Sequence, residues 1–215
     1  MMHKNKNISV IIPIFNEEKT IGDVIKIVGS WPMQPEIVVV DDGSTDGSDL
    51  VVKNLGVKVS YIKLKQNHGK GWAIACGIKE SLGEVLVFLD GDIVGLTHKD
   101  LEKLIAPILN NRTDMVLGAV RFLRLKFLGP VPAISGERVI LRKNVTSHLE
   151  TMKTTGYGVE MLLNKIHANL RVMTVDLPTV YIVDKLKKQS IGVALTSYIK
   201  EWEEVGKQIL AGWKT

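Results

Sequence analysis

Residues 85–92 read Val-Leu-Val-Phe-Leu-Asp-Gly-Asp, an apolar run that ends directly on two acidic residues. The unbroken apolar run predicts a strand that is covered on both faces, as in a parallel sheet. Because only a glycine separates Asp90 from Asp92, both carboxylates can face one point. Carboxylate oxygens suit Mg²⁺ or Mn²⁺, which keep water and substrate phosphate oxygens in their shells. The stretch therefore predicts a buried strand whose end holds a divalent cation through Asp90 and Asp92.

Two apolar runs closer to the N-terminus end in the same manner. Residues 8–14 are followed by Phe15-Asn16-Glu17, and residues 36–40 run into Asp41-Asp42. Ligands of open α/β sheets bind beyond the carboxyl ends of the strands. Ordinary turn chemistry explains any one of these clusters, but it is a poor explanation of all three together. The sequence thus predicts one polar site along one edge of an α/β sheet.

Helical segments separate these runs. Asn16 is expected to cap the first helix, with Glu17 and Glu18 in its first turn, where the helix dipole favours acidic residues. Strands that alternate with helices predict a right-handed, doubly wound α/β sheet that is mostly parallel, with helices on both faces. The remaining elements expected in this half are a helix through about residue 55, a strand at 57–64, a helix ending near 81–83, a helix at 99–109 and a strand at 115–120.

The second half of the chain is less regular. Residues 121–132 are basic and apolar and end in two prolines, which indicates a loop. One domain over 1–189 is the simplest organisation, with a nucleotide-sugar half over about 8–120, an acceptor half over about 121–189 and a helical extension at 190–215. An apolar stripe along the extension is compatible with a homodimer. The other expected elements are a strand at 138–141, helices at 144–152 and from about 159 to 168, and a strand at 171–177.

Composition limits the class of protein. The 215 residues are 45% hydrophobic and 24% charged, as in an ordinary globular protein. No apolar run approaches the ~20 residues that span a bilayer, and the polar N-terminus does not resemble a signal peptide, so we expect a cytoplasmic location. A single cysteine, Cys76, excludes an internal disulfide. The net charge of +5 favours an anionic partner, but no nucleic-acid module is present.

A glycine-containing loop at residues 66–71 opens another expected helix. Its backbone amides and Lys70 are suited to meet an anion at the helix N-terminus. The loop lacks the glycine-lysine spacing of a P-loop. His68 is expected to be a surface residue, and Ser135 lacks the strand-to-helix elbow of a hydrolase nucleophile.

Three segments together resemble the GT-A glycosyltransferases of family 2, over about residues 8–120. They read Val-Ile-Ile-Pro-Ile-Phe-Asn-Glu-Glu at 10–18, Val-Val-Val-Asp-Asp-Gly-Ser-Thr-Asp-Gly at 38–47 and Phe-Leu-Asp-Gly-Asp at 88–92. The resemblance implies a nucleoside-diphosphate sugar as co-substrate and Mg²⁺ or Mn²⁺ as cofactor. Pro13, Phe15 and Glu17 would line the nucleoside pocket, and Asp41 or Asp42 would bind the base or ribose. Lys70 would lie near the phosphates. In the Asp90-Gly91-Asp92 turn, Asp90 would contact the ribose or the metal, and Asp92 would be the direct metal ligand.

The second half shows a narrower resemblance. Ser-Gly-Glu-Arg at 135–138 and Gly-Tyr-Gly-Val-Glu at 156–160 look like the acceptor-side motifs of glucosyl- and mannosyl-3-phosphoglycerate synthases. Where those enzymes carry a metal-binding histidine near the last strand, this chain offers Asp184 or nothing. The resemblance implies that Ser135, Gly136 and Arg138 hold the acceptor or the donor sugar, that Gly156 and Tyr157 shape the acceptor pocket, and that Glu160 touches the sugar or helps catalysis.

The reaction expected is metal-dependent transfer of a hexose from UDP-glucose or GDP-mannose, or a similar donor, to an acceptor such as a phosphorylated small molecule. Basic residues interleave with apolar ones at 121–128, which suits a membrane surface and keeps open a polyprenyl-phosphate glycosyltransferase, peripheral at the inner face of the membrane. Outside this class, a nucleotidyltransferase also places carboxylates and a metal on an α/β sheet, but it would show a glycine-rich loop after the first strand. The stereochemical outcome stays open.

Overall fold

A computed structural model describes residues 7–122 and 135–182 of the chain. Its sheet has the strand order β3-β2-β1-β4-β7-β6-β8-β5. Four parallel strands make one half: β1 (Ile8–Ile14), β2 (Glu36–Asp41), β3 (Ser60–Lys63) and β4 (Val85–Phe88). Ile14 pairs with Asp41, and Ile11 pairs with Phe88, so the carboxyl ends of these strands lie at the same edge.

The other half of the sheet is mixed. β7 (Arg138–Leu141) runs antiparallel to both β4 and β6 (Met115–Phe122). β8 (Val172–Ile182) is parallel to β6, and β5 (Ile93–Val94) is antiparallel to β8. Because Arg138 pairs with Phe88, the start of β7 lies beside the end of β4. The antiparallel strand thus brings residues from the second half to the acidic edge of the first.

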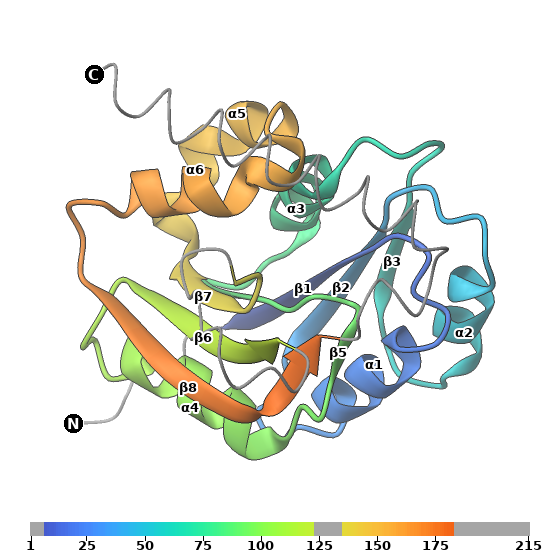
Figure 1. The fold of residues 1–215 in the computed structure, drawn as a ribbon, viewed down its shortest axis with the longest axis horizontal. Helices are drawn as coiled ribbons and strands as arrows, with labels where there is room; N and C mark the ends of the chain where they lie inside the picture. Colours follow the sequence, from blue (N-terminus) through green and yellow to red (C-terminus); the bar gives the residue numbers. More distant parts are fainter. Residues whose placement is uncertain (1–6, 123–134, 183–215) are drawn as a thin grey trace.

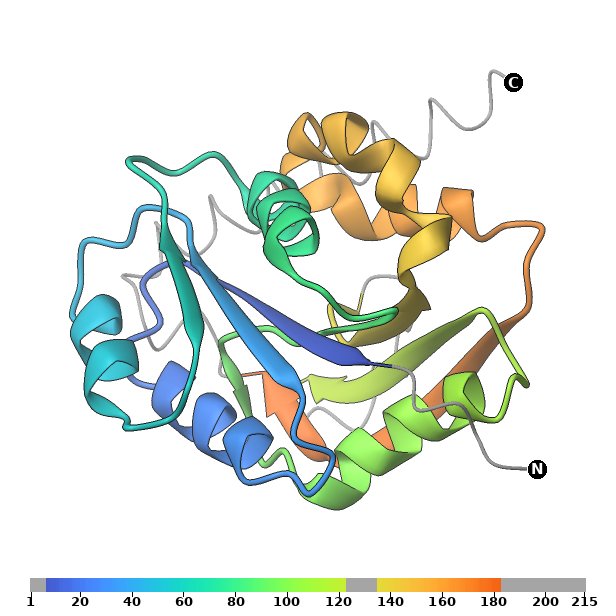
Figure 2. The same cartoon turned by 180° about the vertical axis from the view of Figure 1, so that it is seen from behind.

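Helices cover both faces of the sheet (Figures 1 and 2). α1 (Ile21–Gly29), α2 (Ser48–Asn54) and α4 (His98–Leu109) lie on one side. α3 (Lys70–Glu80), α5 (Leu149–Lys153) and α6 (Val159–Ile166) lie on the other. Short 3₁₀ turns at η2 (Arg142–Asn144), η3 (Thr146–His148) and η4 (Gly156–Gly158) connect the last elements. The prediction of a mostly parallel α/β sheet with two helical layers is confirmed.

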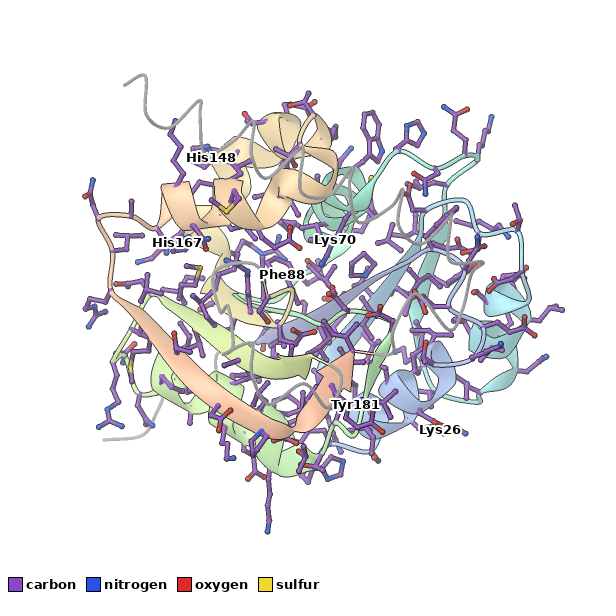
Figure 3. The ribbon with its side chains drawn as sticks, in the orientation of Figure 1. Lys26, Lys70, Phe88, His148, His167 and Tyr181 are labelled. Atoms are coloured by element: carbon purple, nitrogen blue, oxygen red, sulfur yellow. The ribbon has the colours of Figure 1, made fainter. Side chains whose placement is uncertain are left out.

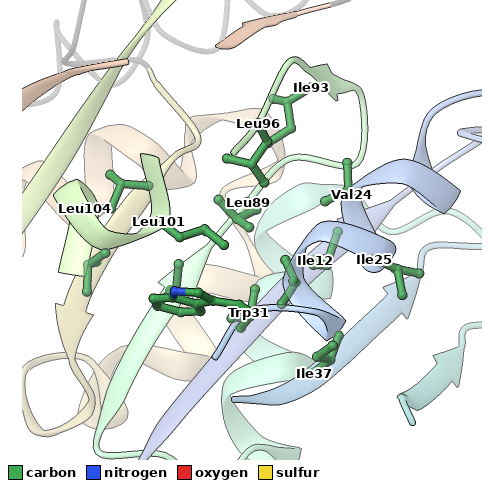
Figure 4. Close-up of a cluster of buried hydrophobic side chains, with 14 of the residues drawn as sticks. Ile12, Val24, Ile25, Trp31, Ile37, Leu89, Ile93, Leu96, Leu101 and Leu104 are labelled. Carbon is green, nitrogen blue, oxygen red and sulfur yellow. The ribbon is translucent and has the colours of Figure 1, made fainter. Parts of the chain in front are cut away.

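Each face of the sheet has its own apolar core. β1 shows the alternation, since Ile12 and Ile14 belong to the cluster beneath α1 and α4, whereas Ile11 faces the cluster beneath α3, α5 and α6. Figure 4 shows part of the first cluster, in which the fully buried Trp31 lies among aliphatic side chains such as Leu101. Burial on both faces explains why the strand sequences are nearly continuous apolar runs.

The entry to α1 differs from the prediction. The helix begins at Ile21 with Thr20 at the N-cap position, so Asn16 does not cap it and Glu17 and Glu18 precede its first turn. Asn16 instead adopts a φ of 58° and its side chain accepts a hydrogen bond from the Thr45 amide at 2.9 Å. The prediction failed because the polar side chain found a partner in a distant loop.

Several helices and strands begin or end at other residues than the sequence predicted. The third strand starts at Ser60, not at residue 57, and the helix predicted at 144–152 is two 3₁₀ turns followed by the short α5. At its start, the guanidinium of Arg142 binds the carbonyls of Ile78 and Gly83, and Val145 bonds back to the Arg142 carbonyl in a tight turn. β6 continues to Phe122 and β8 to Ile182.

Some predictions fall outside the described residues. These are most of the 121–132 loop, Asp184, the domain boundary at 189 and the tail helix. Within the described part of the chain, no helix combines the length and apolarity needed to cross a bilayer.

Candidate active site at the carboxyl edge of the sheet

The Asp90-Gly91-Asp92 turn lies over the end of β1. A Cβ placed on Gly91 would come within 2.7 Å of the Ile14 side chain and 3.4 Å of the Cγ atom of Glu17. This close approach requires glycine and sets the two acidic residues next to the polar segment after β1. Asp92 is buried, whereas Asp90 keeps 19% of its side chain exposed. The structure therefore brings together two of the three polar clusters that the sequence predicted.

Hydrogen bonds fasten the loop after β1 to the loop after β2. The amides of Asn16 and Glu17 donate to the hydroxyls of Ser44 and Ser48 at 2.9 and 2.8 Å. The Glu18 amide donates to Asp46 at 3.1 Å. Side-chain partners thus satisfy consecutive backbone donors, which fixes the two loops relative to each other.

Asp41 holds its own loop in place, and Asp42 holds the loop before α3. The buried Asp41 carboxylate accepts from the Ser44 amide at 2.7 Å and from the Tyr61 hydroxyl at 2.5 Å. Asp42 accepts from the amides of His68 and Gly69 at 2.8 and 2.7 Å. Burial raises the pKa of Asp42 even though these two amides oppose the shift. Both carboxylates accept hydrogen bonds from loop amides, and the contact of Asp41 or Asp42 with a base or ribose stays a prediction.

The Asp42 contacts lead directly to Lys70, the first residue of α3. Its ammonium lies 2.6 Å from Asp90 Oδ1 and 2.7 Å from Glu160 Oε1. Figure 3 shows Lys70 between the α3–α6 layer and the sheet, near Phe88. Burial opposes its charge, yet Asp90 and then Glu160 hold the pKa of Lys70 well above its ordinary value. One cation therefore joins the end of β4 to the first turn of α6.

The Ser135–Arg138 segment packs against the Asp90 carboxylate of this ion pair. A Cβ on Gly136 would overlap both carboxylate oxygens of Asp90, so the backbone of this segment lies against that carboxylate. The buried guanidinium of Arg138 donates to the Ser135 carbonyl at 2.8 Å and to Asn164 at 2.6 Å, and burial lowers its pKa. Arg138 thus ties the segment to α6 in the present arrangement.

Glu137 is a buried acidic residue to which the sequence analysis assigned no role. Its Oε2 accepts from the Ser135 hydroxyl at 2.7 Å, and its Oε1 is buried with no hydrogen-bond partner. Burial, reinforced by the negative charge of Asp90, raises the pKa of Glu137 to about 7. Its position directly before a strand of apolar residues, beside the basic Arg138, was a signal that could have identified it.

The remaining predicted residues lie at the rim. Pro13 and Glu17 are half-buried. Phe15 exposes 39% of its surface, which leaves its aromatic ring accessible to a planar ligand. Gly156 and Tyr157 lie in the η4 turn directly before Glu160, and Gly156 has a φ of 54°. His68 is exposed, as predicted, with its ring stacked on Trp72 at 4.6 Å.

The acidic turn fits a hard divalent cation. Asp90 and Asp92 supply only oxygen donors, which Mg²⁺ and Mn²⁺ prefer. In the described residues, no group of three or more histidine, cysteine, aspartate or glutamate side chains could hold a metal ion. Two carboxylates leave most of the coordination shell to water and phosphate oxygens, as is usual where Mg²⁺ accompanies a phosphorylated substrate.

Known proteins share this fold and sequence pattern. The family model for glycosyl transferase family 2 matches residues 9–159. The chain is 28% identical over 142 residues to glucosyl-3-phosphoglycerate synthase of Mycolicibacterium smegmatis, covering 62% of this chain and 46% of that protein. It is 29% identical over 119 residues to dodecaprenyl-phosphate galacturonate synthase of Rhizobium johnstonii, covering 52% of this chain and 35% of that protein. The matched segments span less than half of these curated relatives.

Solved structures show the same architecture over nearly the whole chain. Glucosyl-3-phosphoglycerate synthase from Mycobacterium tuberculosis, in complex with Mn²⁺, UDP and glucosyl-3-phosphoglycerate, has a TM-score of 0.76 at 21% identity, covering 96% of this chain and 79% of that chain. Its complex with Mg²⁺ and UDP also gives 0.76, at 22% identity and with the same coverage. The fold is therefore of the GT-A type. The chain belongs to glycosyltransferase family 2.

Proposed function

We propose that this protein transfers a hexose from a nucleoside-diphosphate sugar to an acceptor oxygen, with a divalent metal held by Asp90 and Asp92. The observation that carries the proposal is the meeting of the Asp90–Asp92 turn with Lys70 and Glu160 at the carboxyl edge of the sheet. The position matches the edge at which α/β sheets bind ligands. Family membership adds support and sets the nucleotidyltransferase alternative aside.

Each part of the site has a role in this reaction. The segment after β1, with Phe15 at its exposed rim, would bind the nucleoside. Lys70 places a permanent positive charge where the diphosphate would leave, and charge placed in advance is effective electrostatic catalysis. When bound, the metal would neutralise the growing charge of the leaving diphosphate. The start of α6, with Glu160 in its first turn, would face the sugar and the acceptor.

A phosphorylated small molecule is the acceptor class that we favour. The glucosyl-3-phosphoglycerate synthases resemble this chain in sequence and across most of its fold. The segments at 135–138 and 156–160, which resemble their acceptor-side motifs, both lie against the Lys70–Asp90 pair. Glu160 contacts an ammonium and is thus a poor candidate for a general base. Transfer without a general base suits a retaining reaction or an acceptor that attacks through a phosphate oxygen.

A polyprenyl phosphate is the second candidate acceptor. The galacturonate synthase among the relatives is named for a dodecaprenyl phosphate, and the sequence at 121–128 interleaves basic and apolar residues. Sedimentation with vesicles that contain anionic lipid, compared with vesicles of neutral lipid, tests this candidate. Salt-sensitive binding to the anionic vesicles alone would favour it.

Transfer itself is tested by incubating the protein with Mn²⁺, UDP-glucose or GDP-mannose, and either 3-phosphoglycerate or a short polyprenyl phosphate. Mass spectrometry identifies the product, and the release of UDP or GDP gives the rate. We expect product from one donor and one acceptor, dependent on metal and reduced at least about 100-fold by Asp92→Asn. Product that forms at the same rate without metal and in the variant would contradict the proposal.

A further inference from the structure

The ion pairs of Lys70 are shielded from solvent. Lys70 exposes 18% of its side chain, and its partners Asp90 and Glu160 expose 19% and 10%. Surface ion pairs contribute little, whereas the loss of one partner from a shielded pair is costly because it leaves the other charge uncompensated. The ammonium is thus the counter-ion of two carboxylates from different parts of the chain.

Asp90 has little room for a second cation. Its Oδ1 contacts the Lys70 ammonium, and the backbone at Gly136 lies against both of its oxygens. A divalent ion that takes this carboxylate as a ligand meets a positive charge that already occupies it. Two cations cannot share one carboxylate oxygen at short range without strong repulsion.

Resting on the metal-dependent function above, we propose that Lys70 and the divalent cation compete for Asp90. Metal binding then releases the ammonium from Asp90 while Glu160 retains it, so that Lys70 can turn to the donor diphosphate. Until the metal binds, Lys70 neutralises Asp90 in its place, and its two ion pairs keep the end of β4 and the start of α6 together. Because a released ammonium attracts phosphate, metal and nucleotide bind with positive cooperativity.

Binding of Mn²⁺ alone, with no nucleotide, tests the competition. The electron paramagnetic resonance signal of free Mn²⁺ gives the affinity for wild type and for Lys70→Gln, whose amide can still donate to Asp90 and Glu160. The exposed Lys65 lies on the loop that precedes α3, so Lys65→Gln is the matched control for the loss of one positive charge. We expect Mn²⁺ to bind about 10-fold more tightly to Lys70→Gln and to change less than about 2-fold in Lys65→Gln.

The Asp90→Asn background separates competition from simple repulsion. If Lys70 acts by occupying Asp90, the gain from Lys70→Gln disappears once Asp90 is replaced, whereas repulsion of a metal held by Asp92 alone would leave the gain unchanged. Lys70→Arg keeps the charge and can bind the carboxylate through two N–H groups, so it should weaken Mn²⁺ binding severalfold. This variant keeps the test decisive if Lys70→Gln folds poorly, which circular dichroism reports.

The possible outcomes separate the two proposals. Wild type that binds Mn²⁺, with Lys70→Gln no tighter than Lys65→Gln, overturns the competition and leaves the proposed function standing. A gain that persists in the Asp90→Asn background also overturns it. If neither wild type nor Lys70→Gln binds Mn²⁺, both the metal site and the competition fail.

Discussion

The two halves of the site are held together by different forces. On the side of β1, β2 and β3, the loops are fixed by hydrogen bonds between carboxylates or hydroxyls and backbone amides, as Asp42 shows with His68 and Gly69. On the side of β7 and α6, charged side chains are buried and balance one another, as Lys70 does with Asp90 and Glu160. The donors and acceptors of the first arrangement pair with one another, whereas the second contains Glu137, whose Oε1 has no hydrogen-bond partner.

This difference suggests that the two sides of the site play different parts: the β1–β3 side would be rigid, and the β7–α6 side would adjust to its ligand. Satisfied backbone donors would give the nucleoside of the proposed donor a site of fixed shape. Buried charges respond to any ion or proton that arrives, because shielding from water strengthens their interactions. We therefore expect substitutions near Lys70 to alter activity and pH dependence, and substitutions in the first half to alter mainly stability.

Gly136→Ala should have the largest effect. The added Cβ would overlap both oxygens of Asp90 and displace the carboxylate that we propose as a metal ligand. Displacement of a catalytic group by about 1 Å costs about 100-fold in rate, so we expect a loss of this size in donor turnover. Gly56→Ala is the control: its Cβ would meet nothing within 4 Å, but its φ of 67° disfavours alanine, so it should lower stability and leave turnover unchanged. Equal losses of turnover in both variants would contradict the geometry.

Glu137→Gln should flatten the pH dependence of stability. The folded protein raises the pKa of Glu137 from 4.5 to about 7, so the folded state binds this proton more tightly than the unfolded chain does. Its contribution is therefore fully present below pH 4.5 and is lost as the pH rises through about 7. We expect the variant to be more stable than wild type by about 1–3 kcal/mol at pH 8, with a smaller difference at pH 5.

Urea unfolding of both proteins at several pH values, with EDTA present, measures this effect. The amide of the variant can still accept from the Ser135 hydroxyl, so the hydrogen bond is kept. A constant difference across the pH range would show that Glu137 titrates normally in the folded state.

Tyr61→Phe should have the smallest effect. It removes the hydroxyl that donates to the buried Asp41 carboxylate at 2.5 Å. Loss of one partner of a buried carboxylate should lower the free energy of unfolding by about 1–2 kcal/mol and change donor turnover little. Tyr181→Phe, at a residue that is 43% exposed, is the matched control and should stay within about 0.5 kcal/mol of wild type. If Tyr61→Phe is as stable as Tyr181→Phe, the carboxylate does not depend on this bond.

The sequence predicted the first half better than the second for a physical reason. Strands such as β1 and β4 are buried on both faces, so their apolar runs mark them directly, and the turns that follow carry polar residues. β7 is antiparallel and short, and nothing in its four residues reveals its direction or its neighbours. The contact between Gly136 and Asp90 depends on that direction, so it could not be predicted.

Side-chain roles were harder to predict than positions. Lys70 was expected near phosphates, and the structure places its ammonium between Asp90 and Glu160. Asn16 was assigned to a helix cap because caps are local, but its partner is the Thr45 amide, 29 residues away. The carboxylates of Asp41 and Asp42 accept hydrogen bonds from loop amides, and the contact of one of them with a base or ribose stays a prediction. The contacts of Lys70, Asn16 and Asp42 join residues that are far apart in the sequence, and a sequence pattern does not encode such pairings.

Calorimetric titration of nucleotides tests the central claim most directly. UDP, GDP and their glucose and mannose conjugates are titrated into wild type and Asp92→Ala, each with and without Mn²⁺. Our account predicts that one nucleotide class binds wild type with a micromolar Kd only when Mn²⁺ is present, and that Asp92→Ala loses this binding. Failure of every nucleotide to bind wild type, with or without metal, would contradict the donor site at the carboxyl edge of the sheet.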